Sequence, residues 1–360
     1  MDPILLELYT DYLIASFGPT TATGLARLTE EAISHDQVTR LLASPRRTGR
    51  DLWHKVKPLV RKIQSPDGVL IFDDTIEEKP YTDENEIICW HWDHSKGRNV
   101  KGINFITALY QNQDQSLPVS FDIVEKTEFY TDEKTGKLKR RSATTKNERF
   151  RTMLTQCVHN GIEFGYVLAD SWFASAENMR HVKLELDRDF MFPLKANRKV
   201  ALSAEDKQAG HYVRVDALVI EPGTVREIYL KEVPFPLFFT KEIFTNEDGS
   251  SGVLYLVTSD TTLTSDQIKT CYKRRWKVEE YHKSLKQNAS LAKSPTRTET
   301  TQANHLFASL LAFVKLEGLK STTSKNHYAL KTKLYVKALK SAFAELQSLK
   351  QSSFALQPAA

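Results

Sequence analysis

The sequence predicts an α/β protein with a helical segment in front of it. Apolar runs at 69–72 and 166–169 are short and continuous, as in strands that are buried on both faces of a sheet. Residues 147–160 instead carry apolar side chains at helical spacing, and residues 200–262 show the alternation typical of strands. Together these patterns indicate a sheet with covering helices.

Length and composition set broad limits on this fold. A chain of 360 residues, 41% of them hydrophobic, can form one elaborated domain or two to three small ones. The net charge of +5 permits a polyanionic partner without requiring one. Cys89, Cys157 and Cys271 are far apart, so neither a zinc site nor a disulfide framework is indicated.

The same features bear on location. The first residues lack the basic region and the long apolar run of a signal peptide. No stretch reaches about 18 uninterrupted apolar residues, so we expect no membrane span. We therefore expect a cytoplasmic protein in a reducing compartment.

The first 64 residues are predicted to be helical. The first helix ends near Phe17, the second covers Thr23–Ala32, and Ser34 caps a third. Two short helices joined by a tight turn resemble a helix-turn-helix. A helical cap with a merely solvated basic loop is the alternative. The candidate DNA contacts are Arg40 on the third helix and, in the following basic loop Pro45–Arg50, Arg46 and Arg47.

Two predicted strands end in aspartates. Val69–Phe72 leads into Asp73-Asp74-Thr75, and Tyr166–Ala169 leads into Asp170 before a helix capped by Ser175. Ionised carboxylates are costly to bury unless they are paired or bind a metal. Acids at the carboxyl ends of strands are also where open α/β sheets place their chemistry. A turn start at 73–75 and a simple helix cap at Asp170 are the alternatives.

The residues between these two predicted strands are expected to form loops, strands and a helix. Residues 76–101 are polar and aromatic and are predicted to be a loop that contacts DNA near the site. Within it, His91, Asp93 and His94 lack a partner cluster for a metal. The further predictions are strands at 103–110 and 117–124, a mobile basic loop at 134–146 and a helix at 147–160.

After Asp170 the chain is predicted to return to the sheet and then to leave it. A strand at 190–195 is followed by a β-rich segment at 199–262 with a hairpin turn at 246–250. Ser265 is the expected cap of the next helix. The last predictions are an apolar core helix at 304–316 and a Lys-rich, partly helical tail from 321.

Residues 271–286 contain neither Gly nor Pro and are predicted to be one helix. At about 100° per residue, one side of it carries a carboxylate framed by cations and a phenol, while Glu280 points away. A solvated face with i,i+4 ion pairs is the alternative. The residues on that side are Tyr272, Arg275, Glu279, Lys283 and Lys286, and Trp276 lies close by.

The spacing Tyr272-x2-Arg275-x3-Glu279-x6-Lys286 resembles the YREK signature of bacterial insertion-sequence transposases of family four. The resemblance implies that Glu279 is the third carboxylate of a DDE metal site and that Asp170 is the second. It places the first at Asp74, in an Asp-Thr pair, with Asp73 as the alternative.

The resemblance also implies the architecture. It predicts a ribonuclease H-like mixed sheet with helices, formed by residues 66–198 and 263–320 and interrupted by a β-rich insertion at 199–262. A helical DNA-binding region at 1–65 precedes this catalytic domain, and a helical tail at 321–360 follows it.

The implied activity is cut-and-paste DNA transposition, through hairpin ends. Three carboxylates can hold two Mg²⁺ ions, with Mn²⁺ as a substitute, and so activate a water or a DNA 3′-hydroxyl for attack on a phosphodiester. The partners would be double-stranded terminal inverted repeats, target DNA and a second copy of the chain in a synaptic complex. Tyr272, Arg275, Lys283 and Lys286 would bind DNA phosphates. Trp276 is expected to pack in the core in preference to stacking on a base.

Three rival functions remain open at this stage. A metal-dependent nuclease without strand transfer would share the fold and the site. A domesticated, non-catalytic DNA-binding protein would be expected to have lost a carboxylate, whereas all three are present. A structural protein with an incidental match to the signature is the third.

Overall fold

The computed structural model describes residues 2–94, 96–245 and 248–352. The chain divides into two compact units, which are described separately: residues 47–282, and residues 1–46 together with 283–360. Among the described residues, no helix has both the length and the apolar character that a membrane span requires. The functional domain boundaries given above remain predictions.

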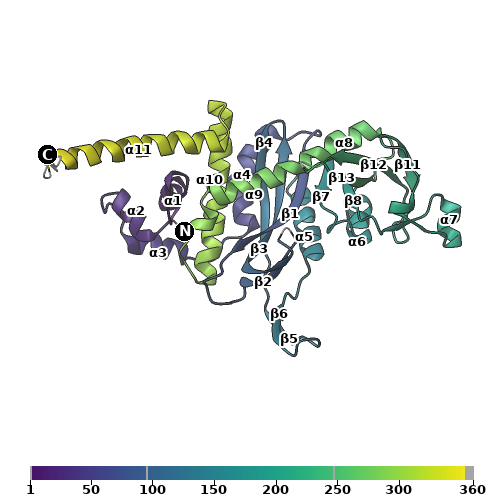
Figure 1. Cartoon of the computed structure of the whole chain (residues 1–360), viewed down its shortest axis with the longest axis horizontal. Coiled ribbons are helices and arrows are strands. Elements are labelled where there is room, and N and C mark those ends of the chain that lie inside the picture. Colours follow the sequence, from purple (N-terminus) through teal and green to yellow (C-terminus); the bar gives the residue numbers. More distant parts are fainter. Residues whose placement is uncertain (1, 95, 246–247, 353–360) are drawn as a thin grey trace, which may run out of the picture. The chain divides into compact units, whose positions relative to one another are not determined.

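A central mixed sheet dominates the unit 47–282 (Figure 1). In it, β1 (Val69–Glu78) pairs antiparallel with β3 (Arg98–Asn112), which pairs antiparallel with β4 (Gln115–Ile123). On its other side β1 pairs in parallel with β7 (Tyr166–Ala169), and β7 pairs in parallel with β8 (Asp189–Leu194). This sheet and its helices confirm the predicted α/β class and are compatible with a ribonuclease H-like fold.

One face of the sheet is covered by α5 (Lys146–His159) through an aromatic core. The Phe150 ring packs edge-on against Phe72 of β1, with ring centroids 4.7 Å apart, and stacks on Phe173 at 5.4 Å. All three side chains are fully buried. Such ring pairs contribute about 0.5–1.5 kcal/mol beyond area burial. These ring contacts hold β1 in place at the residue directly before its two aspartates.

The other face carries α8 (Ser265–Lys273), a 3₁₀ turn η3 (Arg274–Trp276) and the start of α9 (Lys277–Gln287). The predicted single helix at 271–286 is therefore wrong in one respect, because a 3₁₀ turn interrupts it. The predicted cap is also off by one residue. Thr264 caps α8, with its side chain and that of Gln267 forming a capping box.

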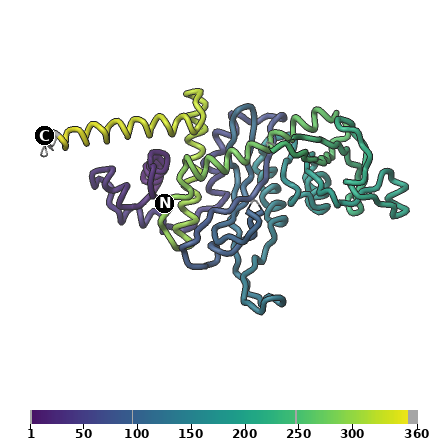
Figure 2. The backbone as a smooth tube through the Cα atoms, in the orientation of Figure 1, coloured from purple at the N-terminus to yellow at the C-terminus, as the bar shows by residue number. Residues whose placement is uncertain are grey.

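The prediction of a loop at 76–101 is wrong, and that of a loop at 134–146 needs correction in part. Residues 88–93 form β2 (Ile88–Asp93), which pairs with β3, and β1 continues past its aspartates to Glu78. The loop prediction failed because an edge strand can carry many polar residues, and such a sequence resembles that of a loop. Within the predicted mobile basic loop at 134–146, only residues 138–141 are strand: β6 (Leu138–Arg141) pairs with β5 (Glu128–Thr131) in a hairpin (Figure 2). In this hairpin Arg140 lies over the Phe129 ring.

The β-rich segment extends the same sheet. Strands β11 (Val225–Ile228), β12 (Leu237–Thr245) and β13 (Ser251–Thr258) are antiparallel, and β13 pairs with β8. Part of the predicted turn at 246–250 lies outside the described residues. The remaining elements of this unit are α4 (Gly49–Ile63), α6 (Ala176–Arg180), the π-helical η1 (His181–Glu185), β9 (Lys199–Val200), α7 (Ala204–Ala209), β10 (Val213–Arg214) and η2 (Val215–Ala217).

The other unit is helical. It contains α1 (Pro3–Ala15), α2 (Ala22–Leu28), α3 (His35–Leu42), η4 (Leu291–Lys293), α10 (Glu299–Thr323) and α11 (His327–Ser352). Ser34 caps α3 as predicted. The second helix ends at Leu28, earlier than predicted, because the Thr29 hydroxyl donates back to the carbonyls of Leu25 and Ala26.

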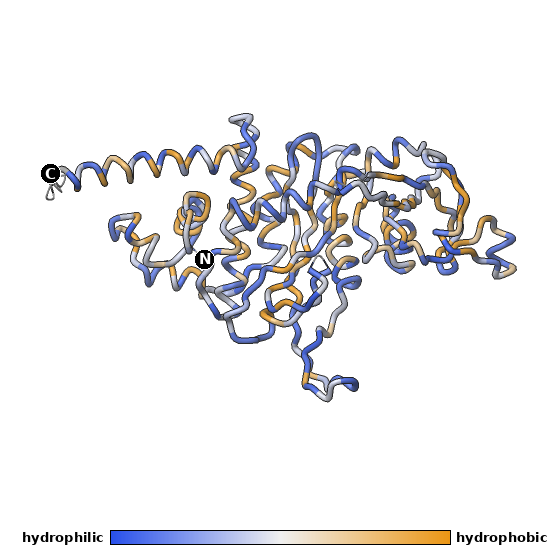
Figure 3. Tube along the Cα trace, viewed as in Figure 1, coloured by the Kyte–Doolittle hydropathy of each residue, from blue (hydrophilic) through white to orange (hydrophobic). Residues whose placement is uncertain are grey.

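One prediction at the boundary of this unit needs correction, and another agrees with the structure. The predicted basic loop 45–50 is shorter than expected, since α4 begins at Gly49. The Lys-rich tail from 321 is largely helical in its described part, as predicted: α10 ends at Thr323, and α11 covers His327–Ser352, along which apolar and polar residues alternate (Figure 3).

Candidate active site

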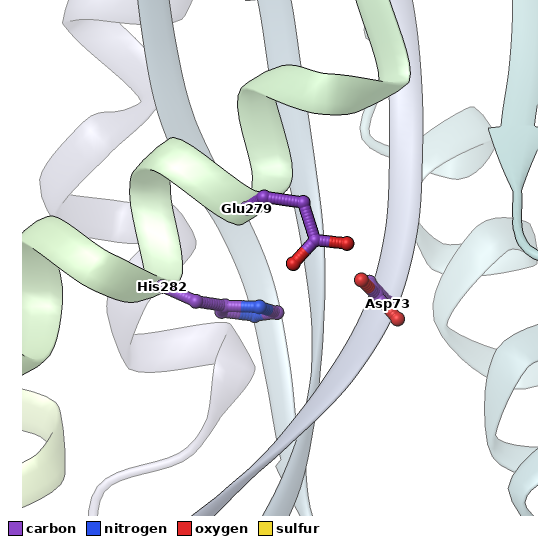
Figure 4. Close-up of side chains that lie close together, drawn as sticks. All are labelled: Asp73, Glu279 and His282. Carbon is purple, nitrogen blue, oxygen red and sulfur yellow. The ribbon is translucent and has the colours of Figure 1, made fainter. Parts of the chain in front are cut away.

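Three potential metal ligands meet between β1 and α9. Asp73, Glu279 and His282 each offer one ligand atom, and these atoms lie within 4.8 Å of one another (Figure 4). Glu279 and His282 are three residues apart and therefore share a face of the helix. Asp73 projects toward them from the strand. Because the helix and the strand are both packed in the core, the site is held by rigid elements.

Strand alternation separates the two candidate aspartates of β1. Asp73 pairs with Thr107 and Asp74 with Ile106, so their side chains leave opposite faces of the sheet. Asp73 is on the face that carries α9. The Asp74 Oδ2 atom accepts hydrogen bonds from Lys146 Nζ at 2.7 Å and from Asn104 Nδ2 at 2.6 Å. Asp74 is thus engaged on the α5 side.

Asp170 lies beside Asp73 because of the parallel pairing of β1 and β7. Phe72 of β1 pairs with Ala169, the last residue of β7. Asp73 and Asp170 are the next residue on each strand, so they are neighbours at the carboxyl end of β7. The carboxylate of Asp170 accepts the backbone N–H of Trp172 at 2.9 Å. As predicted, Asp170 stands at the end of a buried strand, and Ser175 caps the helix that follows.

The carboxylates repel one another. Burial raises the pKa of Asp73 well above its usual range, and the charges of Asp170 and Asp74 raise it further. Burial also raises the pKa of Asp170, with a further contribution from Asp74. Arg275 partly offsets this repulsion, because its Nη1 lies 3.7 Å from Asp73 Oδ2 and 3.4 Å from Glu279 Oε1. Buried acids with so little compensation favour a bound cation.

The donor set fits a hard divalent ion. Carboxylate oxygens are the ligands that Mg²⁺, Mn²⁺ and Ca²⁺ prefer, and one imidazole nitrogen is compatible with Mn²⁺. His282 is absent from the predicted ligands. Its spacing of three residues from Glu279 was a usable signal, since i,i+3 side chains of a helix can reach the same ion.

The remaining residues of the signature are placed differently. Tyr272 is buried, and its hydroxyl donates to the backbone carbonyl of Ala169 at 3.2 Å, directly before Asp170. Burial raises the pKa of this phenol. Trp276 is 63% exposed, so the expected packing in the core is wrong. Stacking of Trp276 on a base remains a prediction, as does phosphate binding by Tyr272.

The basic candidates lie elsewhere in the chain. Lys283 and Lys286 belong to the part of α9 in the helical unit, where Lys283 Nζ is 5.7 Å from the Tyr328 ring centroid. Arg40 is exposed on α3, and Arg47 donates to Asp51 at 3.0 Å. Arg46 is half-buried. Phosphate or DNA binding by these residues remains a prediction.

Comparison with known proteins identifies the family. The family described as DDE superfamily endonuclease matches residues 5–214, which is more than half of the chain. The chain belongs to the DDE superfamily of endonucleases. The matched region of this DDE endonuclease includes Asp73, Asp74 and Asp170, and it ends before Glu279.

Other comparisons add little to this assignment. No curated protein matches the chain. Among solved structures, the Drosophila P element transposase strand transfer complex aligns over 95% of this chain and 86% of that chain. Its sequence identity is 8% and its TM-score 0.27. Family membership therefore rests on the first comparison alone.

Proposed function

We propose that the protein is the DDE transposase of a bacterial insertion sequence of family four. It would bind the terminal inverted repeats of its element, cleave there in a metal-dependent reaction and join the freed ends to target DNA. The observation that carries the proposal is the meeting of Asp73 with Glu279 on the YREK helix, beside Asp170. Membership of the DDE superfamily supports it.

The proposed ligands are Asp73, Asp170 and Glu279, with His282 adjacent. Asp73 takes the place of Asp74 in this proposal because it faces Glu279, whereas Asp74 is bonded to Lys146 and Asn104. The site would hold two Mg²⁺ ions, with Mn²⁺ as a substitute. Such ions, when bound, lower the pKa of a water or a 3′-hydroxyl and stabilise the leaving oxygen.

The residues of the chain contribute orientation and charge. The guanidinium of Arg275 reaches both Asp73 and Glu279 and can offset the repulsion between their carboxylates while it attracts a phosphate. Tyr272 fixes the backbone just before Asp170. Along the same helix Lys283 and Lys286 would bind phosphates of the transferred end. Hairpin formation at that end and a dimer in the synaptic complex complete the proposal.

The decisive test is Mg²⁺-dependent cleavage of a labelled duplex that carries the terminus of the element. Asp73→Asn, Asp170→Asn and Glu279→Gln should each lower the rate by at least about 100-fold, since each removes a ligand from the reacting centre. Glu280→Gln is the matched control, because Glu280 is exposed and pairs only with Lys277 among the ion pairs described.

The same series tests the assignment of each residue. If Asp74→Asn abolishes cleavage and Asp73→Asn does not, the first ligand is Asp74 and the geometry described here is not that of the active enzyme. If Glu280→Gln abolishes cleavage and Glu279→Gln does not, the helix register is wrong. Both outcomes can be read only for variants whose melting temperature without metal is no lower than that of the wild type.

A nuclease without strand transfer is the second candidate, favoured by the description of the family as endonucleases. Strand transfer distinguishes the two. A precleaved terminus incubated with plasmid DNA should be joined covalently by a transposase, and the joined product should disappear with Glu279→Gln. Cleavage without any joined product would instead favour the nuclease.

A further inference from the structure

A row of exposed aromatic rings lies next to Asp170. The ring centroids of Trp92 and His94 are 6.3 Å apart, and those of His94 and Trp172 are 5.8 Å apart. Lys195 Nζ lies 5.6 Å from the centroid of the Trp172 ring. We call Trp92, His94, Trp172 and Lys195 the aromatic row. None of them is used by the chemistry described above.

Core packing does not explain the row. Trp92 is 52% and Trp172 46% exposed, and His94 and Lys195 are exposed as well. On β2 the alternation turns His91 inward and Trp92 outward. Large aromatic side chains left in water forgo the free energy that burial would give them. Neighbouring exposed aromatics of this kind mark an interaction surface.

The fold brings the row to the catalytic edge of the sheet. Asp170 accepts the backbone N–H of Trp172, so this tryptophan is tied to a candidate ligand. Lys195 follows directly on β8, the parallel neighbour of β7. Because β2 and β1 are both antiparallel to β3, the carboxyl ends of β2, β7 and β8 point the same way. Rings and cation therefore gather at one end of the sheet, where Asp170 lies.

We propose that the aromatic row is a stacking surface for unpaired DNA bases next to the phosphodiester that is cleaved. Aromatic rings stack on the face of any base, and a nearby cation binds the backbone phosphate, which is the usual composition of single-strand binding surfaces. In an intact duplex these faces are hidden by neighbouring base pairs. The row therefore fits a frayed or single-stranded end better than a duplex, and the charge of Lys195 complements a nucleic acid.

This inference rests on the proposed function in that DNA is the substrate and that Asp170 belongs to the cleavage site. It is tested by the affinity for a fluorescent 12-nucleotide single strand and for a duplex of the same sequence, both in EDTA so that no cleavage occurs. Trp92→Ala and Trp172→Ala should each weaken single-strand binding about 5- to 150-fold, which is the expected cost of losing one base–aromatic stack. Duplex binding should change by less than about threefold.

Matched variants separate stacking from other effects. Tyr81→Ala removes a ring that is 94% exposed and outside the row, and it should leave single-strand binding unchanged. Trp172→Phe should keep most of the affinity, whereas Trp172→Leu should lose it, because leucine has no aromatic face. Lys195→Gln should reduce both the affinity and its dependence on salt.

Several results would overturn the proposal. One is that Trp92→Ala and Trp172→Ala bind the single strand as tightly as the wild type. Another is that these variants lose as much affinity for the duplex as for the single strand. The third is that Tyr81→Ala loses as much single-strand affinity as they do. Because the assay needs no metal, a protein that fails to cleave its termini can still show the predicted pattern. Conversely, if the wild type cleaves its termini and the tryptophan variants bind the single strand normally, the aromatic row is not a stacking surface and the transposase proposal still stands.

Discussion

A single residue position decides which aspartate of β1 faces the helix. Successive side chains of a strand alternate between the two faces of a sheet, so a shift by one residue moves a carboxylate to the opposite side. Asp73 meets Glu279 and His282, while Asp74 is held by Lys146 and Asn104. Because Lys146 is the first residue of α5 and donates to Asp74, we expect Asp74 to orient the start of α5.

His91 gives a prediction at the same scale. Burial, assisted by the charges of Lys126 and Lys146, lowers the pKa of His91 to about 3. The folded protein thus binds fewer protons at this site than the unfolded chain, whose histidine titrates near 6.5. The free energy of unfolding should therefore fall as pH drops from about 6.5 toward 3. At pH 4 this contribution is about 3 kcal/mol, at 1.36 kcal/mol per pH unit.

The measurement is urea unfolding of the wild type and His91→Gln at pH 7 and pH 4. The variant lacks the titrating imidazole, so its unfolding free energy should drop less between the two pH values. Since all other groups titrate alike in both proteins, the difference between the two drops isolates His91. Equal drops would contradict the prediction.

At the scale of elements, the 3₁₀ turn η3 determines how the signature residues are presented. Arg274 donates to Gln111 Oε1 at 2.6 Å, to the Gln111 carbonyl at 2.8 Å and to the Asp67 carbonyl at 2.6 Å. These bonds attach the turn to the start of β1 and the end of β3. The next residue, Arg275, then points to the carboxylates, and α9 begins with Glu279 in its first turn.

Arg274→Ala should therefore destabilise this unit. The substitution leaves three acceptors without their donor, and hydrogen bonds to charged groups contribute about 1.5–3 kcal/mol each, with some replacement by water. We expect a loss of about 2–4 kcal/mol in urea unfolding, and a smaller loss for Arg274→Lys. Lys273→Ala, at an exposed neighbouring position, should stay within about 0.5 kcal/mol. A loss in Lys273→Ala as large as that in Arg274→Ala would contradict the assigned role.

At the scale of the molecule, the site joins parts of the chain that are distant in sequence. Asp73, Asp170 and Glu279 come from a strand, from the end of another strand and from a helix. Their mutual repulsion, which raises the pKa of Asp73 and Asp170, opposes the packing of these elements. A divalent ion would offset this repulsion, and its binding energy would add to the free energy of unfolding.

Added MgCl₂ should accordingly raise the melting temperature of the wild type. At 100 times the dissociation constant the gain is about 2.7 kcal/mol. This corresponds to about 5–10 °C for a unit of this size, at 2–4 °C per kcal/mol. Asp73→Asn and Glu279→Gln should show no such rise, and without metal Asp73→Asn should melt no lower than the wild type. Thermal melts in KCl of matched ionic strength provide the control, and an equal rise in KCl would contradict a specific site.

Local patterns in the sequence were sufficient for much of the fold. The apolar runs at 69–72 and 166–169, the helix at 147–160 and the caps Ser34 and Ser175 are all present as predicted. Burial periodicity and capping depend on residues within one or two turns of each other, so they can be read from the chain alone. Edge strand β2 was missed, because its Trp90 and Trp92 are exposed while the polar His91 between them is buried, the reverse of the pattern that indicates a buried face.

The sequence by itself determined the α/β class, the carboxylates available for a site and the helix that carries Glu279. Only the tertiary structure decided that Asp73 faces that helix, that His282 joins it, and that Trp92 and Trp172 lie on one row. The reason is physical. The face of the sheet on which a strand side chain lies depends on strand register. The direction of the helix side chains depends on a 3₁₀ turn, and the hydrogen bonds of Arg274 to residues more than 160 positions away set its position. Such long-range contacts leave no periodic trace in the sequence.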